Sequence, residues 1–549
     1  MNTSCCTNPI RINTLLIKNR IVFPAMCTKY AAPDGGVTER MLRYYEERAK
    51  GGAGLVTIEA TSVDPTGNSF SRGLSIADDA RLPGLTELAR RVKRHGARIS
   101  IQLQHGGGRA HPEYSHMPRR VMSVIPGVFE PDNAITLDGA ASRTHGARRH
   151  CAPSPPGSTP WKSTGPAAIC SNRQCPRSPT AAPTGTADRS PSACAFPPRS
   201  PAPSALRWAK ISPSSTSVED VPTGNGIGLD TTVELCRALT DAGVNAFDIT
   251  AGMQCCFELM TPPTCMPKAW NAATSAAVKQ AIGDRARVML TGRISDADTA
   301  ERVVRDGLAD FAIMGRALIA DSHLVEKYAS GHKDEICPCV ACGQGCVGNA
   351  DKMIPITCAL NPLSGREASM PAVPKAETPR RVAVVGAGPA GLMAAATAAE
   401  RGHEVILLER SDRHGGQINL AAVPPHKDDL RLISDYLYRK AQCAGVAFRF
   451  SCEATPESVR ELSPDAVIVA TGSLPVIPHF CASAAGAVTA QDILSGAEAG
   501  KNVLVLGGGL IGCETAEYLA AQGRSVTVVE MLPQLAKDME WCARVLLLR

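Results

Sequence analysis

The sequence has no run of about 18 consecutive apolar residues, the length that a transmembrane helix requires. Its N-terminus lacks the basic, apolar and small-residue pattern of a secretory signal peptide. In a chain without such a leader, the 21 cysteines are expected to be thiols or metal ligands in a reducing compartment rather than disulfides. These absences predict a cytoplasmic protein without a membrane partner. At 549 residues, about three domains are expected.

Acidic and large apolar residues are scarce in the segment from Gly139 to Thr216. It contains ten Lys and Arg and one acid, Asp188, so its own charge is +9. Because the net charge of the whole chain is +6, the rest of the chain carries about −3. Its richness in Pro, Ser, Thr, Ala and Arg is typical of a disordered linker. Because it interrupts a pattern that continues on both sides, translation out of frame is the alternative. The scattered charge and the lack of a stacking platform disfavour nucleic acid as a partner.

Four cysteines follow the spacing C-x2-C-x3-C-x11-C: Cys339, Cys342, Cys346 and Cys358. Four thiolates suit a [4Fe–4S] cluster or zinc. Zinc ribbons usually use two CxxC pairs at matched spacing, whereas here three ligands lie within eight residues and the fourth follows alone. The spacing therefore favours an iron–sulfur cluster and one-electron transfer, and a group of reduced, buried cysteines is the alternative.

Strand-like and helix-like segments alternate on both sides of the anomalous segment. This pattern predicts an α/β fold with a TIM barrel, and an open doubly wound sheet is the alternative for this half of the chain. Catalytic groups of a barrel lie at the C-terminal strand ends. Strands are expected over residues 19–26, 55–63, 98–108, 245–252, 286–294 and 310–318, and helices over 38–54, 82–97, 231–244, 272–282 and 296–309.

Each of the last two predicted strands of this half ends in glycine followed by arginine, Gly292-Arg293 and Gly315-Arg316. Barrels often hold phosphate at this place, because backbone N–H groups approach closely at glycine and arginine pairs with phosphate oxygens. We therefore expect a phosphate site here. A structural arginine that faces solvent is the alternative for either pair alone.

Two copies of a strand, a GxGxxG loop, a helix and a second strand follow a linker at residues 368–378. With an acid about 20 residues further on, each copy predicts a dinucleotide site, with the pyrophosphate at the helix N-terminus and the ribose on the carboxylate. After the first copy, Gln417 and the strand end Ala470-Thr471-Gly472 are typical of a flavin-binding domain, so the first site is expected to take FAD. The acid of the second copy would repel the 2′-phosphate of NADPH, so NADH is preferred there. A domain of this kind needs further strands, so the C-terminus is expected to be cut short. The motifs are Gly386, Gly388, Gly391 and Glu409 in the first copy, and Gly507, Gly509, Gly512 and Glu530 in the second.

The order of the blocks LIKNRIVFPAM, YYEERAKGGAGL, QLQHGGGR, GRI, MGRALIAD, the cysteine spacing and GAGPAGL resembles the 2,4-dienoyl-CoA reductase/NADH:flavin oxidoreductase family. That family has an Old Yellow Enzyme-like FMN barrel, a [4Fe–4S] segment and tandem Rossmann-like FAD and NAD(P) domains. The resemblance covers residues 10–138 and 217–549. It implies a barrel at 1–335 with 139–216 anomalous, a cluster segment at 336–367, the linker at 368–378, an FAD domain at 379–500 and an incomplete NAD(P) unit at 501–549.

Site residues are implied by position. The family's proton donors and one flavin-binding arginine would fall in residues 139–216, so no catalytic residue is assigned. The implied FMN contacts are Pro24, Ala25, Met26 and Cys27 against the ring, Ala60 beside it, Gln102 on its pyrimidine edge, and Gly292, Arg293, Gly315 and Arg316 at the phosphate. The implied cluster ligands are Cys339, Cys342, Cys346 and Cys358; the implied FAD contacts are Gly386, Gly388, Gly391, Glu409, Gln417, Ala470, Thr471 and Gly472; those for NADH are Gly507, Gly509, Gly512 and Glu530.

The resemblance implies an enzyme that passes electrons from NADH through FAD and a [4Fe–4S] cluster to FMN and reduces an activated C=C bond. The substrate would be an enoyl or dienoyl thioester, an enoate or an enone. One alternative is an amine oxidoreductase similar to trimethylamine dehydrogenase, which the second glycine motif disfavours because that route needs no nicotinamide. Another is a non-catalytic, defective fragment, because a barrel that lacks several central strands cannot close. The substrate and the oligomeric state, with a homo-oligomer as one candidate, are left open.

Overall fold

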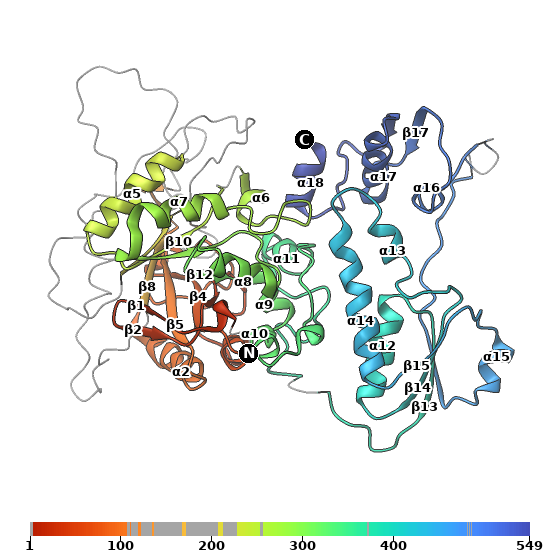
Figure 1. Cartoon of the computed structure of the whole chain (residues 1–549), viewed down its shortest axis with the longest axis horizontal. Helices are drawn as coiled ribbons and strands as arrows, with labels where there is room; N and C mark the ends of the chain where they lie inside the picture. The colour runs from red at the N-terminus through yellow and green to blue at the C-terminus, as the bar shows by residue number, and fades with distance from the viewer. Residues whose placement is uncertain are drawn as a thin grey trace. The chain divides into compact units, whose positions relative to one another are not determined.

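The computed structural model describes residues 4–106, 110, 119–121, 134–136, 167–171, 207–211, 228–252, 256–370, 373–479, 481, 484 and 486–549. The chain divides into two compact units, which are described separately (Figure 1). None of the helices in these parts of the chain is long and apolar enough to cross a membrane. The first unit comprises Met1–Thr261, Lys268–Ser330 and Gly345–Ala368, and the second Pro262–Pro267, Gly331–Gln344 and Ser369–Arg549.

The first unit contains a closed barrel of parallel strands in the order β10-β11-β12-β3-β4-β5-β8-β9. The predicted TIM barrel is therefore confirmed, and the open sheet is excluded for this half of the chain. The paired strands are shorter than the apolar runs that predicted them. They are β3 (Ile21–Phe23), β4 (Leu55–Ser62), β5 (Arg98–Gln104), β8 (Ala167–Ser171), β9 (Arg207–Ile211), β10 (Ala246–Ile249), β11 (Arg287–Leu290) and β12 (Phe311–Ile313).

Two of the barrel strands, β8 and β9, come from the anomalous segment. β8 pairs with β5, β9 pairs with β10, and the two pair with each other. The expectation that the barrel lacks central strands and cannot close is therefore wrong: a five-residue run is enough to pair where formed strands already stand on either side. The remainder of residues 139–216, with the expectations of a disordered or out-of-frame segment, lies outside the described residues.

Two of the helices that follow the barrel strands begin at residues whose side chains cap the helix. Thr38 accepts the N–H of Met41 at the start of α1 (Glu39–Lys50), and Asp296 accepts the N–H of Thr299 at the start of α8 (Ala297–Arg305). Each side-chain oxygen satisfies an N–H that has no partner within the helix. The other long helices of this unit are α2 (Leu82–Lys93), α5 (Leu229–Asp241) and α7 (Ala272–Ile282).

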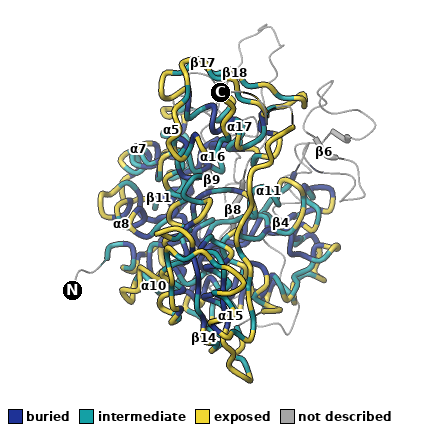
Figure 2. Tube along the Cα trace, turned by 90° about the vertical axis from the view of Figure 1, so that its right-hand side faces the viewer, coloured by how far each residue is buried: buried dark blue, intermediate teal, exposed yellow. Residues whose placement is uncertain are grey.

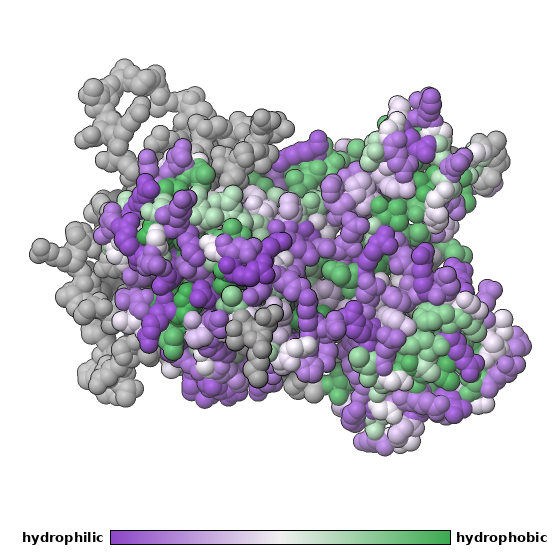
Figure 3. Space-filling view, viewed as in Figure 1, coloured by the Kyte–Doolittle hydropathy of each residue, from purple (hydrophilic) through white to green (hydrophobic). Residues whose placement is uncertain are grey.

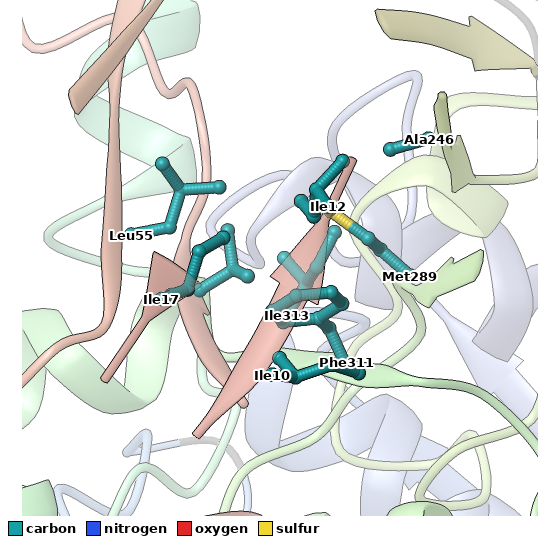
Figure 4. Close-up of a cluster of buried hydrophobic side chains, with 9 residues drawn as sticks. Ile10, Ile12, Ile17, Leu55, Ala246, Met289, Phe311 and Ile313 are labelled. Atoms are coloured by element: carbon teal, nitrogen blue, oxygen red, sulfur yellow. The ribbon is translucent and has the colours of Figure 1, made fainter. Parts of the chain in front are cut away.

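An antiparallel hairpin of β1 (Ile10–Ile12) and β2 (Leu15–Ile17) lies at the N-terminal end of the barrel. The side chains of Arg98 and Arg287, the first residues of β5 and β11, donate to hairpin carbonyls. Apolar hairpin residues pack with barrel residues in one buried cluster (Figure 4). This packing fills one end of the barrel and leaves the C-terminal strand ends for a site. The cluster consists of Ile10, Ile12, Ile17, Val22, Leu55, Ala246, Met289, Phe311 and Ile313.

The second unit holds two parallel sheets. The first has the order β15-β14-β13-β16, with α12 (Pro389–Glu400) and α14 (Arg431–Cys443) packed together beside it. The second pairs β17 (Asn502–Leu506) with β18 (Ser525–Val529), joined by α17 (Leu510–Ala521). Both have the predicted Rossmann-like connection. The strands of the first sheet are β13 (Arg381–Val385), β14 (Glu404–Leu408), β15 (Ala447–Arg449) and β16 (Ala466–Val469).

Candidate functional site

The residues predicted to bind FMN lie at the same end of five neighbouring strands. In the barrel order, β11, β12, β3, β4 and β5 are consecutive. Because all strands are parallel, the segments that follow them, or their last residues, meet at the C-terminal rim, where barrels carry their sites. Pro24–Cys27 follow β3, Ala60 and Gln102 lie in the last parts of β4 and β5, Gly292-Arg293 follow β11, and Gly315-Arg316 follow β12.

A break in register within β4 sets the direction of these residues. Ile58 pairs with Ile101, but Ala60 pairs with Gln102, so Glu59 is the extra residue of a β-bulge. A bulge re-aims the side chains after it, and bulges are frequent next to active sites. The structure thus places Ala60 opposite Gln102, the two residues expected on the flavin ring.

Glycine is required where β12 ends against β3. A Cβ at Gly315 would lie 2.9 Å from Met26 Sδ and 3.1 Å from Pro24 Cγ. Gly315 and Arg316 are not the end of a strand, as predicted, but the first residues of α9 (Gly315–Ala320). The apolar run 310–318 misled the prediction because it spans a three-residue strand and the buried face of this helix. Arg293, in the other Gly-Arg pair, has the left-handed φ of 52°.

A buried carboxylate at the bulge was not predicted. Glu59 Oε2 accepts the N–H of Thr28 (2.9 Å), the Thr28 hydroxyl (2.5 Å) and the Tyr45 hydroxyl (3.3 Å). Burial raises the pKa of Glu59 to about 7, and the hydrogen bonds from Thr28 and Tyr45 act in the opposite direction. Glu59 therefore titrates near neutral pH within hydrogen-bonding distance of the residue after Cys27. The only sequence signal for Glu59 is its position within the predicted strand 55–63.

The segment between the third and fourth cysteines packs on the barrel within the first unit. The N–H of Ile356 donates to the Thr28 carbonyl (3.1 Å), and the Tyr30 hydroxyl donates to the Ile356 carbonyl (2.7 Å). In the sequence, Ile356 lies two residues before Cys358, and Thr28 directly follows Cys27. These contacts bring the chain next to a predicted cluster ligand against the chain next to the predicted flavin site.

Arginines of α1 hold the chain that follows the fourth cysteine, Cys358. Arg40 Nε donates to the Gly365 carbonyl (2.7 Å), and Arg48 Nη1 pairs with Glu367 (2.5 Å). Arg48 is fully buried, and its guanidinium lies 3.6 Å from the centre of the Tyr44 ring. Breaking one partner of a buried ion pair costs roughly 3–5 kcal/mol, so this contact fixes the segment firmly. Sequence reasoning missed these residues because their partners lie about 320 positions away.

The four predicted cluster cysteines are all half-buried. Cys339 and Cys342 belong to the second unit, and Cys346 and Cys358 to the first. Within the described part of the chain, no group of three or more His, Cys, Asp and Glu side chains is placed to hold a metal ion. The donor set itself, four thiols at short spacing, has the chemistry that a cluster needs, so the cluster stays a prediction.

The first glycine loop fits a dinucleotide pyrophosphate. A Cβ at Gly391 would lie 1.9 Å from the Gly386 carbonyl oxygen, whereas a Cβ at Gly388 would meet nothing within 4 Å. The Ala387 N–H donates to Glu409 Oε2 (2.6 Å), so the carboxylate is held at the loop. Glycine is therefore needed for packing at Gly391, while Gly388 leaves open space at the start of α12.

The other residues predicted for FAD meet beside this loop. Gln417 Nε2 donates to the Ser473 carbonyl (2.7 Å), directly after Gly472, which has φ of 79°. The Ala470 N–H donates to the Val385 carbonyl, and a Cβ at Gly386 would lie 2.4 Å from the Ala470 carbonyl oxygen. The Ala470-Thr471-Gly472 turn therefore adjoins the glycine loop.

The second glycine loop repeats the first. A Cβ at Gly512 would lie 1.8 Å from the Gly507 carbonyl oxygen, and the Gly508 N–H donates to Glu530 Oε2 (2.7 Å). Hydrogen bonds from the N–H groups of Leu532 and Gly508 lower the pKa of Glu530. An ionised carboxylate at this position accepts hydroxyl donors and repels phosphate.

Family models match both halves of the chain. The NADH:flavin oxidoreductase/NADH oxidase family matches residues 7–141, and the pyridine nucleotide-disulphide oxidoreductase family matches residues 380–546. These segments contain the first three barrel strands and both glycine loops.

Individual proteins are similar over most of the chain. An NADH oxidase of Thermoanaerobacter brockii is 32% identical, over 97% of this chain and 84% of the relative. A cinnamate reductase of Clostridium sporogenes is 32% identical over 57% of this chain and 45% of the relative. A 2-naphthoyl-CoA reductase in complex with 2-naphthoyl-CoA superposes with a TM-score of 0.83 at 24% identity, over 100% of this chain and 86% of that one, and this likeness shows the fold.

Proposed function

Because this chain belongs to the NADH:flavin oxidoreductase/NADH oxidase family, we propose that it is an NADH-dependent iron–sulfur flavoprotein that reduces an activated C=C bond. The groups would supply redox chemistry: electrons from NADH would reach the substrate through FAD, a [4Fe–4S] cluster and FMN. The substrate would be an enoyl or dienoyl thioester, an enoate or an enone, and the cinnamate reductase supports this choice. The observation that carries the proposal is the meeting of all predicted FMN residues on five consecutive strand ends.

The barrel residues would bind and orient the flavin. The strand-end residues Pro24–Cys27 and Ala60 would lie against its ring, and the Gln102 amide would meet its pyrimidine edge. Arg293 and Arg316, each after a glycine, would neutralise its phosphate. The bulge at Glu59 supports this assignment, because it pairs Ala60 with Gln102.

In the second unit, the two glycine loops would hold FAD and NADH. The N-termini of α12 and α17 would receive the two pyrophosphates, and Glu409 and Glu530 the ribose hydroxyls. Glu530 would select NADH over NADPH. We also keep the domain boundaries predicted above and Cys339, Cys342, Cys346 and Cys358 as cluster ligands, for which the spacing is the support.

The test is to count the cofactors of the anaerobically purified protein and then to assay it. Denaturation should release FMN and FAD in equal amounts, and chemical analysis should find about four iron and four sulfide per chain. NADH should be oxidised in the presence of cinnamate or an enoyl thioester, with the saturated product identified by mass spectrometry. Oxidation of an amine instead, without NADH and with ferricyanide as the electron acceptor, would support the amine oxidoreductase.

Two cysteine variants test the electron route. Cys346→Ala should lose iron and NADH-driven C=C reduction while the FAD still reacts with NADH and ferricyanide. Cys443→Ala is the matched control, because Cys443 is an exposed cysteine at the end of α14. Unchanged C=C reduction in an iron-free Cys346→Ala protein would remove the cluster from the route.

A further inference from the structure

Lys29 is a buried cation six residues after β3 that has no role in the binding scheme above. Its exposed fraction is 2%, and it has the left-handed φ of 62°. For a side chain other than glycine, this backbone region costs about 1 kcal/mol or more, and such residues gather at functional sites. A lysine would not be buried in this conformation unless its surroundings held it there.

Two neutral side chains hold the ammonium group. Lys29 Nζ lies 4.0 Å from the centre of the Phe70 ring and 3.4 Å from Met353 Sδ. Met353 also has a left-handed φ, 57°, and its carbonyl accepts the Ser71 hydroxyl (3.0 Å). An aromatic face and a thioether attract a cation, but neither neutralises its charge.

The nearby acids compensate this charge only in part. Lys29 has no ion pair within 4.0 Å among the residues that the structure describes. Burial lowers its pKa, while the charges of Cys27 and Glu59 act in the opposite direction. Glu59 already accepts hydrogen bonds from Thr28 and Tyr45 and titrates near neutral pH. A buried ammonium with such partners favours any further negative charge that arrives beside it.

We propose that Lys29 is a positioning residue that stabilises the negative charge of the reduced FMN ring and so raises the reduction potential of that flavin. The proposal rests on the proposed function, which places the ring against Pro24–Cys27, two residues before Lys29. Its geometric basis is a buried cation six residues after β3, whose ammonium group contacts both the Phe70 ring and Met353, a residue between Cys346 and Cys358. A compact charge in a region shielded from water acts more strongly than the same charge at the surface.

The experiment measures the FMN midpoint potential of the holoenzyme by anaerobic dye equilibration. Lys29→Met should favour oxidised FMN at least tenfold, a fall of about 30 mV for a two-electron couple. Lys29→Arg keeps the charge and should restore most of the wild-type value. The FAD potential from the same titration is an internal control and should not move.

Lys18→Met is the matched control variant. Lys18 precedes β3 and so lies near the N-terminal end of this strand, whereas Lys29 follows its C-terminal end. The Lys18 ammonium group donates to the carbonyls of Ala49 and His95. Its pKa is also lowered by burial. Removing this half-buried lysine should cost stability in a similar way but leave the FMN potential unchanged.

The outcomes separate this proposal from the function on which it rests. An unshifted potential in an FMN-containing Lys29→Met protein overturns the role of Lys29 and leaves the proposed function standing. Wild-type protein without FMN overturns both. If Lys29→Met fails to hold FMN, Lys29→Gln replaces it: a potential within threefold of wild type again overturns the role, whereas loss of FMN from both neutral variants, with retention in Lys29→Arg, supports it.

Discussion

The two glycine loops have nearly the same geometry, although their sheets are buried to different extents. The distance from the loop N–H to the strand-end carboxylate is 2.6 Å at Glu409 and 2.7 Å at Glu530. Yet β13 is mostly buried, whereas exposure alternates along β17 and β18, as Figure 2 shows for their trace. Figure 3 shows apolar areas on the surface of this unit. The loop conformation is therefore set by the local chain and does not depend on how well the sheet is covered.

The loops differ at the helix that each one starts. Among the residues that the structure describes, no side chain caps the N-terminus of α12, whose N-cap residue is Gly388. At α17, by contrast, the Leu510 N–H donates to Asp538 Oδ1 (2.8 Å), and this carboxylate lies 3.6 Å from the position of a Cβ on Gly509. A helix N-terminus attracts anions, so Asp538 takes the place that a pyrophosphate would use. The α17 N-terminus of the second loop therefore already has an anionic group beside it, which distinguishes it from the first loop.

The largest expected effect on dinucleotide binding comes from replacing the third glycine of either loop. In Gly391→Ala the new methyl would meet the Gly386 carbonyl, so we expect FAD binding to weaken by roughly 100-fold or more. Gly512→Ala should instead abolish NADH binding and keep FAD. Gly388→Ala adds a methyl into open space, so this protein should keep its melting temperature but bind less FAD. Flavin content, melting temperature and NADH titration measure these effects, and full FAD content in Gly391→Ala would contradict the packing argument.

Glu59 extends the comparison to a strand-end carboxylate whose pKa is raised rather than lowered. Because the folded pKa of about 7 lies above the ordinary glutamate value of 4.5, the unfolded chain releases this proton first, and stability should fall as pH rises from about 4.5 through 7. We expect a loss of roughly 2 kcal/mol over this range that Glu59→Gln lacks. Chemical denaturation of both proteins at pH 5 and pH 8 measures the difference. An identical pH profile for the two proteins would count against a buried, titrating Glu59.

Replacing a large apolar residue with alanine should lower the free energy of unfolding by different amounts in the two sheets. Val384 in β13 is fully buried, while Leu504 in β17 is 59% exposed. We expect Val384→Ala to lower the free energy of unfolding by about 2 kcal/mol and Leu504→Ala by less than about 0.5 kcal/mol. Urea denaturation followed by flavin fluorescence measures both. Equal losses would show that β17 is covered in solution.

The smallest expected effect is at Asp538. Asp538→Asn keeps an acceptor for the Leu510 N–H but removes the negative charge, so NADH affinity should rise about threefold at low salt. The gain should disappear in 1 M salt, because the repulsion is electrostatic. Fluorescence titration with NADH gives the dissociation constants, and FAD content is the control. A loss of affinity would mean that the carboxylate supports the loop rather than competing with the ligand.

Local patterns predicted the glycine loops well, because the contact of the third glycine with the first and the hydrogen bond to the carboxylate both lie within about 25 residues of chain in each loop. Gly386, Gly391 and Glu409 are needed by the turn, the packing and the hydrogen bond that the motif encodes. Strand lengths were overestimated, since the apolar run 286–294 continues beyond the four paired residues of β11. Apolarity records burial, and residues after a barrel strand are buried as well.

Long-range partners account for what was missed. Thr28 meets Glu59 across 31 residues, and Lys29 meets Met353 across 324. None of these four residues belongs to a motif, so their roles appear only when the barrel has closed. β8 and β9 also depend on long-range partners. The composition of their segment predicted a linker, but they form strands by pairing with β5 and β10 of the barrel.

The bulge at Glu59 also affects how this chain can be compared or recombined with other barrels. A regular strand of the same span would be one residue shorter, so an alignment that ignores the bulge shifts every later position by one. Ala60 would then be matched to a residue that points to the opposite face. A chimera joined within β4 should therefore carry Leu55–Ser62 as a single block, so that the parental phase of side chains at the rim is preserved.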